Sequence, residues 1–270
     1  PESNIAARGV RFVESGIGRT MALNYGAMTD LLRSAPRESD VAAPDSPFEM
    51  DLPLPEGGYG RFRVVESSIM EPELAKRYPM LRTYLGQGVD NPTATVRFDL
   101  TARGFRAQVI AATHTTYIEP FQRGDIGNYV VFNKSDYRKQ SEPFYCGVTG
   151  EEIKSIPNIL RRNDVSKIAS GGNLRTYRLA LAATGEYTAA LGGTVLDGLS
   201  GIVTTMNRVN GIYEREVAVR MILVANNDLL VYTNGATDPY TNGSGSAMLG
   251  ENQTNLNTVI GNANYDIGHV

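Results

Sequence analysis

The pattern of hydrophobic and polar residues divides the chain into two parts. Between residues 61 and 140, apolar and polar residues alternate over short segments, which is typical of β-strands with one buried face. Two neighbouring segments show this most clearly, with Val96, Phe98 and Leu100 on one face of the first and Phe105, Ala107 and Val109 on one face of the second. Gly104 separates them, so we predict an antiparallel hairpin with one face on a core and the other in water.

Further strands and one helix complete the predicted first unit. Strand-like segments cover 61–68, 115–121 and 128–137. Residues 20–35 carry apolar residues at helical spacing, with Asn24 as N-cap and Pro36 ending the run. A Pro- and Gly-rich connector with short extended pieces follows at 40–60. We therefore expect one helix laid against a mostly antiparallel sheet.

The second part alternates strands with helices. A strand is predicted over 175–184, and Thr194 begins a helix whose capping box is completed by Asp197 and whose end is predicted at Asn210–Gly211. The apolar stripe of this helix is Val195, Leu199, Ile202, Met206 and Val209. The nearly continuous apolar segment 216–224 predicts a strand covered on both faces and parallel to the first. A polar tract over 232–253, a short helix over 252–260 and a terminal strand complete an α/β unit, so the predicted fold class is α+β.

Composition limits the classes of function. The 270 residues are 41% hydrophobic and 20% charged, with a net charge of −3, as in a soluble folded protein. The sequence has no excess of basic residues, so nucleic acid is not an expected partner. It also has no run of about 18 apolar residues, so no membrane-spanning helix is predicted. The chain ends within a predicted strand at Val270, which suggests a fragment.

The polar, charged segment 141–172 is the predicted connection between the units. We assign residues 1–160 to a β-rich domain, 161–172 to a linker and 173–270 to the α/β domain. The charges of Glu151, Glu152, Arg161 and Arg162 are expected to be solvated.

Candidate chemistry is sparse. The chain has no His-Glu-x-x-His motif, no Walker A loop and no Gly-x-Ser-x-Gly motif. Its two histidines are His114, expected to be an ordinary sheet residue, and His269, near the last residue. The single cysteine, Cys146, lies between Pro143 and Gly147. Its thiolate could be a zinc ligand, but a small buried apolar residue is an equally good interpretation.

Several segments resemble one family of enzymes. PFYCGV, around Cys146, is similar to the P-K-x-C-G-V cysteine-switch segment in prodomains of adamalysin-type, reprolysin-like zinc metallopeptidases of the metzincin group. The segment 82–109 resembles the prodomain of secreted bacterial members. Residues 173–270 resemble the N-terminal half of the bacterial catalytic domain, most specifically over 212–270.

The resemblance implies a function and a mechanism. It implies a secreted endopeptidase zymogen that acts on proteins or peptides, with Zn²⁺ held by three histidines and a glutamate as general base. Those residues would follow Val270, so this chain would be truncated before the zinc-binding helix and inactive alone. Cys146 would be an inhibitory zinc ligand, and cleavage at Arg161–Arg162 would release the prodomain.

Two departures from the family pattern limit what is carried over. Phe144 and Tyr145 replace the basic residue that usually precedes the switch cysteine, so docking would depend on aromatic packing. Related enzymes often carry a calcium-binding glutamate where this chain has Arg178, so no calcium site is predicted there.

Two other hypotheses remain open. The chain could be a non-enzymatic secreted adhesion or binding protein with a degenerate peptidase-like scaffold, using the Asn/Gly/Tyr-rich tract 232–246 as a recognition loop. Alternatively, residues 1–160 could act as an intramolecular chaperone or an inhibitor in trans. The sequence does not specify the substrate preference or the oligomeric state.

Overall fold

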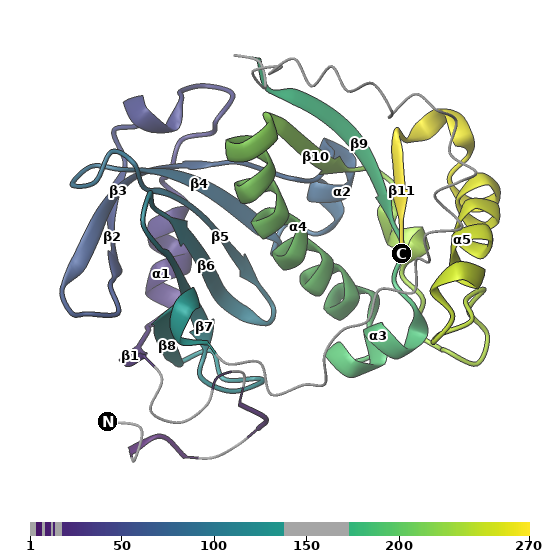
Figure 1. Cartoon of the computed structure of the whole chain (residues 1–270), viewed down its shortest axis with the longest axis horizontal. Coiled ribbons are helices and arrows are strands. Elements are labelled where there is room, and N and C mark those ends of the chain that lie inside the picture. The colour runs from purple at the N-terminus through teal and green to yellow at the C-terminus, as the bar shows by residue number, and fades with distance from the viewer. Residues whose placement is uncertain (1–3, 7–8, 12, 14–17, 138–172) are drawn as a thin grey trace, which may run out of the picture.

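Two sheets lie on either side of a long central helix (Figure 1). The computed structural model describes residues 4–6, 9–11, 13, 18–137 and 173–270. In order through the molecule, the layers are α1, an eight-stranded sheet, α4, a three-stranded sheet and α5. The mixture of helices with a curled antiparallel sheet agrees with the predicted α+β class.

The first unit, residues 18–137, is built on the eight-stranded sheet. Its elements are β1 (Arg19–Ala22), α1 (Tyr25–Leu32), β2 (Glu49–Pro53), β3 (Tyr59–Glu66), α2 (Pro72–Arg77), β4 (Arg82–Gly88), β5 (Thr95–Thr101), β6 (Gly104–Ile110), β7 (Thr115–Pro120) and β8 (Asn128–Asn133). The strand order is β1-β8-β7-β6-β5-β4-β3-β2, and every neighbouring pair is antiparallel. The predicted antiparallel meander is therefore confirmed.

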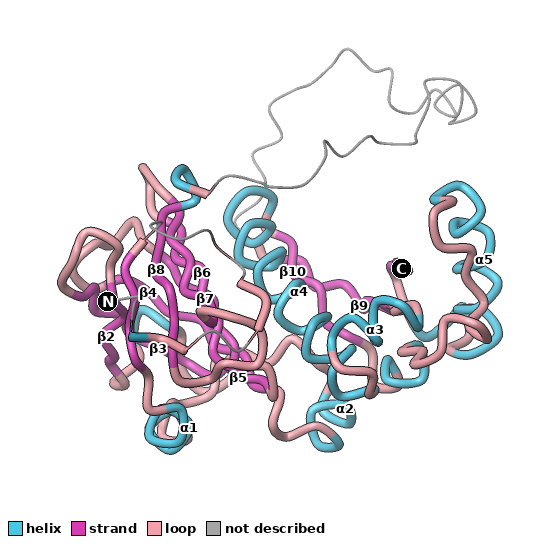
Figure 2. Tube along the Cα trace, turned by 90° about the horizontal axis from the view of Figure 1, so that it is seen from below, coloured by secondary structure: helices cyan, strands magenta, loops and turns pink. Residues whose placement is uncertain are grey.

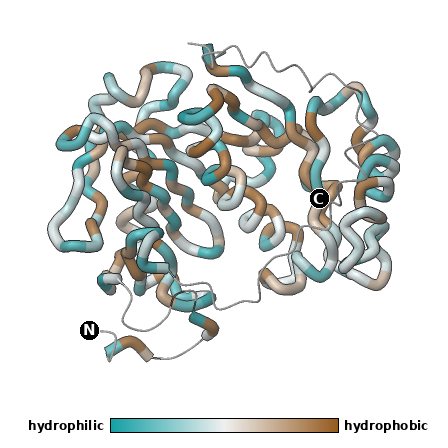
Figure 3. The backbone as a smooth tube through the Cα atoms, in the orientation of Figure 1, coloured by the Kyte–Doolittle hydropathy of each residue, from teal (hydrophilic) through white to brown (hydrophobic). Residues whose placement is uncertain are grey.

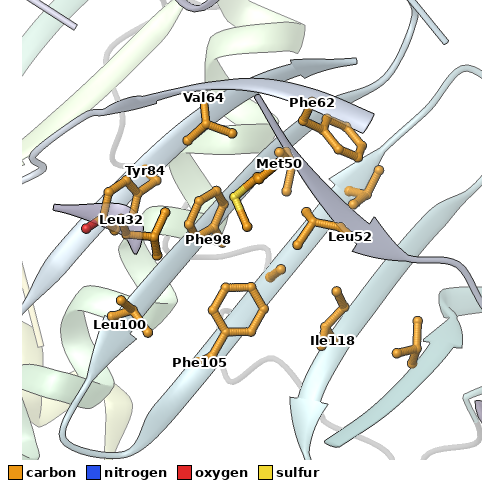
Figure 4. Packing of buried hydrophobic residues seen from close by; sticks show 14 of the residues in the cluster. Leu32, Met50, Leu52, Phe62, Val64, Tyr84, Phe98, Leu100, Phe105 and Ile118 are labelled. Atoms are coloured by element: carbon orange, nitrogen blue, oxygen red, sulfur yellow. The ribbon is translucent and has the colours of Figure 1, made fainter. Parts of the chain in front are cut away.

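One face of this sheet carries the core of the first unit (Figure 4). The sheet curls, so that Met50 and Leu52 of edge strand β2 join the same cluster as Phe98 and Phe105 of the central strands. Tyr84 stacks on Phe98 with ring centroids 4.8 Å apart. Helix α1 lies against this face.

The N-terminal helix is shorter than predicted. Asn24 is the N-cap, and its side chain accepts a hydrogen bond from the backbone N–H of Ala27 at 3.0 Å, as the sequence predicts. Residues 19–22, however, form β1, which pairs with β8. They lie before the predicted N-cap, and the sequence predicted no strand there. The helix itself ends at Leu32, before the end predicted at Pro36. The sequence prediction also missed β4 and α2.

The second unit, residues 173–270, is an α/β layer. Its elements are β9 (Arg175–Leu181), α3 (Gly185–Leu191), α4 (Val195–Val217), β10 (Val219–Leu223), α5 (Gly245–Val259) and β11 (Ile267–His269). Both β10 and β11 pair with β9 in parallel, in the order β10-β9-β11. The predicted parallel pair is confirmed. Short 3₁₀ turns complete the chain at Ala43–Asp45, Lys134–Asp136, Asn227–Leu230 and Asn262–Asn264.

Alternate residues of β9 serve two cores. Leu179 and Leu181 face α4, whereas Ala180 and Ala182 belong to a separate cluster with α5. Figure 3 shows hydrophobic segments on both sheets and on α4. Helix α4 contacts β5 and β6 of the eight-stranded sheet and packs on β9 and β10 of the three-stranded sheet. Among the described helices, none is by itself long and apolar enough to cross a membrane, although α3 and α4 together pass that test across a 90° bend.

Two helix boundaries differ from the predictions. The capping box of Thr194 and Asp197 is confirmed, but α4 continues past Asn210–Gly211 to Val217, with Ala218 as its C-cap at a φ of 53°. Asn210 is buried, and its side-chain amide bonds the backbone N–H and C=O of Met221 at 2.9 and 2.8 Å. It links α4 to β10 rather than ending the helix. Helix α5 begins at Gly245, inside the tract predicted as a connector.

The predicted water-facing side of the hairpin is wrong. The polar residues that alternate with the core on β5 and β6 are Arg97, Asp99, Arg106 and Gln108, and all four are buried. Helix α4 covers this face of the sheet, as Figure 2 also shows from a second direction. Alternation indicates that two faces differ in polarity, but it does not distinguish water from a polar protein surface.

Candidate functional site

A mostly apolar cleft of about 710 Å³ lies between α4 and the three-stranded sheet, beside β11. Its apolar walls come from β9, α4 and β11, including Leu181, Met206 and Ile267. The lining residues with polar side chains are Thr184, Tyr187, Thr205, Tyr213 and His269. Clefts lined mainly by apolar side chains with a few polar groups are typical of binding sites.

The polar groups of the cleft are few and differ in their surroundings. Thr184 is the N-cap of α3 and accepts a hydrogen bond from the backbone N–H of Tyr187 at 3.2 Å. Burial raises the pKa of the Tyr187 hydroxyl. His269 is exposed on β11, and its carbonyl accepts a hydrogen bond from Ala182 N–H at 2.8 Å. These hydroxyls and one imidazole do not form a nucleophile–base pair.

A second candidate site is the polar interface between the eight-stranded sheet and α4. Arg97 of β5, 1% exposed at its side chain, makes a bidentate ion pair with Glu214 of α4: Nη2 to Oε1 at 2.6 Å and Nε to Oε2 at 3.1 Å. Arg220 also pairs with Glu214 and makes a second bidentate pair with Glu38, both contacts at 2.8 Å. Arg97, Glu214, Arg220 and Glu38 therefore form a continuous row of alternating positive and negative charges to which both units contribute.

A parallel set of contacts lies further along the same face. Glu119 of β7 accepts hydrogen bonds from Arg106 Nε at 3.0 Å and from Arg208 of α4. Thr204 Oγ1 of α4 donates to Asp99 Oδ1 at 2.8 Å. Two arginines from different units thus share one carboxylate, and the adjacent Asp99 is fully enclosed.

Burial controls the electrostatics of this interface. Burial raises the pKa of Asp99 to about 7, although Arg208, Thr204 and Arg106 act in the opposite direction. Burial also lowers the pKa of the Arg97 guanidinium, which Glu214 opposes. At Glu38, burial acts to raise the pKa, but hydrogen bonds from Arg220 and Ser67 outweigh it. The pKa of Glu38 is therefore lowered.

The residues predicted to carry the chemistry lie outside the described part of the chain. Cys146, Arg161 and Arg162 fall within 138–172, as do Glu151 and Glu152. Their predicted roles as inhibitory ligand, processing site and linker charges therefore stay predictions, and so does the domain boundary near residues 160–172.

The two histidines lie far from a common site. His114 is in the exposed turn between β6 and β7, with Nδ1 3.0 Å from Thr113 Oγ1, so the prediction of a sheet histidine is wrong. His269 belongs to the other unit. Within residues 18–137 and 173–270, no group of three or more His, Cys, Asp or Glu side chains could hold a metal ion.

Arg178, at which the sequence predicts no calcium site, forms an ion pair with Asp266. Its Nη2 contacts Asp266 Oδ1 at 2.8 Å, and its backbone N–H donates to Asp266 Oδ2 at 2.7 Å. Arg178 therefore holds the Asp266 carboxylate through both its guanidinium and its backbone N–H.

The tract 232–246, which a recognition loop would use, packs against α5. Tyr232 donates to Asn255 Oδ1 at 2.6 Å, and Tyr240 donates to Asn252 Oδ1 at 2.9 Å. The two rings meet edge to face, with centroids 5.9 Å apart. Both tyrosine hydroxyls therefore have partners within the α/β unit. The signal for this packing was the pair of asparagines at helical spacing in the following segment.

Comparison with known proteins places the α/β unit in context. Residues 173–270 match the model of the metallo-peptidase family M12B, reprolysin-like. No curated protein matches the chain. The match begins where the second unit begins and covers its strands and helices through β11. It supports a reprolysin-like metallopeptidase at the level of the family for this part of the chain.

Proposed function

We propose that the chain belongs to the precursor of a secreted, zinc-dependent endopeptidase that cleaves proteins or peptides. In this proposal residues 173–270 are the first part of the catalytic domain, and residues 1–160 keep the precursor latent. The observation that carries the proposal is the family match over 173–270, because it coincides with an α/β unit of parallel strands and a long capped helix.

The described residues do not fit a zinc site. They bring no three suitable ligands together, so we assign no catalytic step to any of them. The proposal instead places the zinc ligands after Val270, as the resemblance implies. It gives Cys146 the role of an inhibitory ligand, which requires a deprotonated and accessible thiol.

Expression of the full-length precursor tests this proposal. We would compare the protein with Cys146 intact, a Cys146→Ala variant and a Ser141→Ala control from the same segment. We expect the Cys146→Ala variant alone to cleave denatured casein without prior processing, and a zinc chelator to abolish the cleavage.

Each outcome separates the parts of the proposal. Cleavage of casein that appears only after processing, and equally in all three proteins, would support the peptidase function. The same result would exclude the role of Cys146 as a cysteine switch. A precursor that shows no chelator-sensitive cleavage before or after processing would overturn the peptidase and favour a secreted binding protein.

A further inference from the structure

We propose that residues 18–137 are a lasting non-covalent partner of residues 173–270, so that cutting the connecting segment leaves a two-chain complex. The proposal goes beyond the peptidase function and does not depend on it, because it concerns only contacts between described residues. It also opposes the expectation that cleavage at Arg161–Arg162 is enough to release the first unit.

The first argument is a shared apolar core. Four residues of the first unit belong to the same cluster as β9, α4 and β10: Ile69, Met70, Leu74 and Leu81. Ile69 and Leu74 are completely buried. Separation of the units would return these four side chains, and the part of the shared cluster that they cover, to water. The core that β9 and β10 form with α4 is therefore completed by residues of the first unit.

The second argument is backbone pairing across the boundary. Leu223 N–H of edge strand β10 donates to Ile69 C=O at 2.8 Å, and Glu71 N–H donates to Leu223 C=O at 2.9 Å. The Glu71 carboxylate accepts from Ala225 N–H at 2.7 Å. Residues 69–71 thus extend the three-stranded sheet, and their departure would leave an open edge.

The third argument is the distribution of charge. Arg97 and Asp99 on the sheet face Glu214 and Thr204 on α4, and Arg208 of α4 faces Glu119 on the sheet. Each unit thus supplies a carboxylate to an arginine of the other. This complementarity fixes the register between the two surfaces and disfavours other partners.

Two rim contacts extend the interface. Arg103 and Arg123 of the first unit donate to the carbonyls of Leu191 and Ala190, the latter at 2.7 Å. These carbonyls lie at the C-terminal end of α3, where a cation is favourable. At the opposite end, Arg77 makes a bidentate pair with Asp228, at 2.7 and 3.1 Å.

The experiment cleaves the chain between the two units and leaves all the contacts described above unchanged. A recognition sequence for a site-specific protease is inserted between residues 150 and 160 of the full chain, and circular dichroism confirms that the uncut protein is folded. After complete cutting, the sample is diluted and analysed by size-exclusion chromatography with light scattering. We expect one peak that contains both fragments at the mass of the uncut chain. Two separate peaks would overturn the proposal.

A matched pair of variants tests the role of the buried charges. Glu214→Gln removes the charge shared by Arg97 and Arg220, and Glu216→Gln makes the same change two residues later, at a side chain 67% exposed. After cutting, we expect Glu214→Gln to weaken association by about 30-fold or more and Glu216→Gln to leave it within about twofold. Equal association of the two variants would refute the charge argument. The wild-type elution alone decides whether the complex persists, and no readout uses peptidase activity.

Discussion

Replacement of Asp99 by asparagine should stabilise the protein more at high pH than at low pH. Asp99 is enclosed between β5 and α4, where Thr204, Arg208, Arg106, Glu119 and the Tyr25 hydroxyl are the polar groups around it. Burial raises the pKa of Asp99 to about 7, from an ordinary value of 3.8. Since the folded state holds the proton more tightly, the stability from this group is complete below about pH 4 and is lost as the pH rises through 7.

The size of the effect follows from this difference in pKa. Between pH 5 and pH 8, the wild-type protein should lose about 3 kcal/mol of unfolding free energy through this group. Asparagine does not titrate, so the stability of Asp99→Asn relative to wild type should increase by about the same amount over that range. Any constant change from the altered contact with Thr204 cancels in this comparison.

Urea unfolding followed by far-ultraviolet circular dichroism at pH 5 and pH 8 measures the effect. Asp51→Asn makes the same substitution at an exposed position of β2 and is the matched control. If the difference between Asp99→Asn and wild type is the same at both pH values, the carboxyl is ionised normally and the reasoning is refuted.

Three further predictions concern single side chains. Glu38→Gln should lower stability most above about pH 5. Burial opposes the lowering of the pKa of Glu38, but the hydrogen bonds from Arg220 and Ser67 outweigh it, so the stabilisation is complete above the ordinary value of 4.5 and is lost as the pH falls from there through the lowered pKa. Denaturant titrations at about pH 3 and pH 7 would show this, and equal losses would contradict it. Asn210→Ala should lower the free energy of unfolding by about 2–4 kcal/mol, since it leaves the backbone N–H and C=O of Met221 in β10 without their side-chain partner. A decrease of less than about 0.5 kcal/mol in a denaturant titration would refute the link between α4 and β10. Gly185→Ala should destabilise the protein by about 2 kcal/mol or more, because a Cβ there would lie 2.0 Å from the backbone nitrogen of Gly235. Gly245→Ala, at the first residue of α5 and with open space around it, should be neutral or stabilising by about 0.5–1 kcal/mol. A lower melting temperature for Gly245→Ala than for Gly185→Ala would exclude this account.

The sequence predicted elements well where the signal was local. The capping box of Thr194 and the apolar stripe of α4 depend on neighbours within one helix, and both are present in the structure. The same holds for Asn24 at α1. Long-range contacts were harder to predict. Asn210 followed by Gly211 is typical of a helix end, but the amide is used by Met221 eleven residues later, and the helix continues.

The candidate site was only partly predictable, for the same reason. Arg97 and Asp99 occupy alternate positions on β5, as residues on a solvated face do, and their partners lie more than a hundred residues away on α4. The pattern of one strand does not contain that information. The chemistry predicted for Cys146 concerns a residue outside the described chain, so it still awaits the cysteine experiment.

The position of α4 has a consequence for how the protein unfolds. One side of the helix packs Leu199 and Ile202 into the core beneath β9, and another side supplies Asn207 and Glu214 to the eight-stranded sheet. Loss of this helix would expose the apolar core beneath β9 and the buried polar side chains on one face of the eight-stranded sheet. We therefore expect the two units to unfold together, so that a destabilising substitution in either unit lowers the melting temperature of the whole chain.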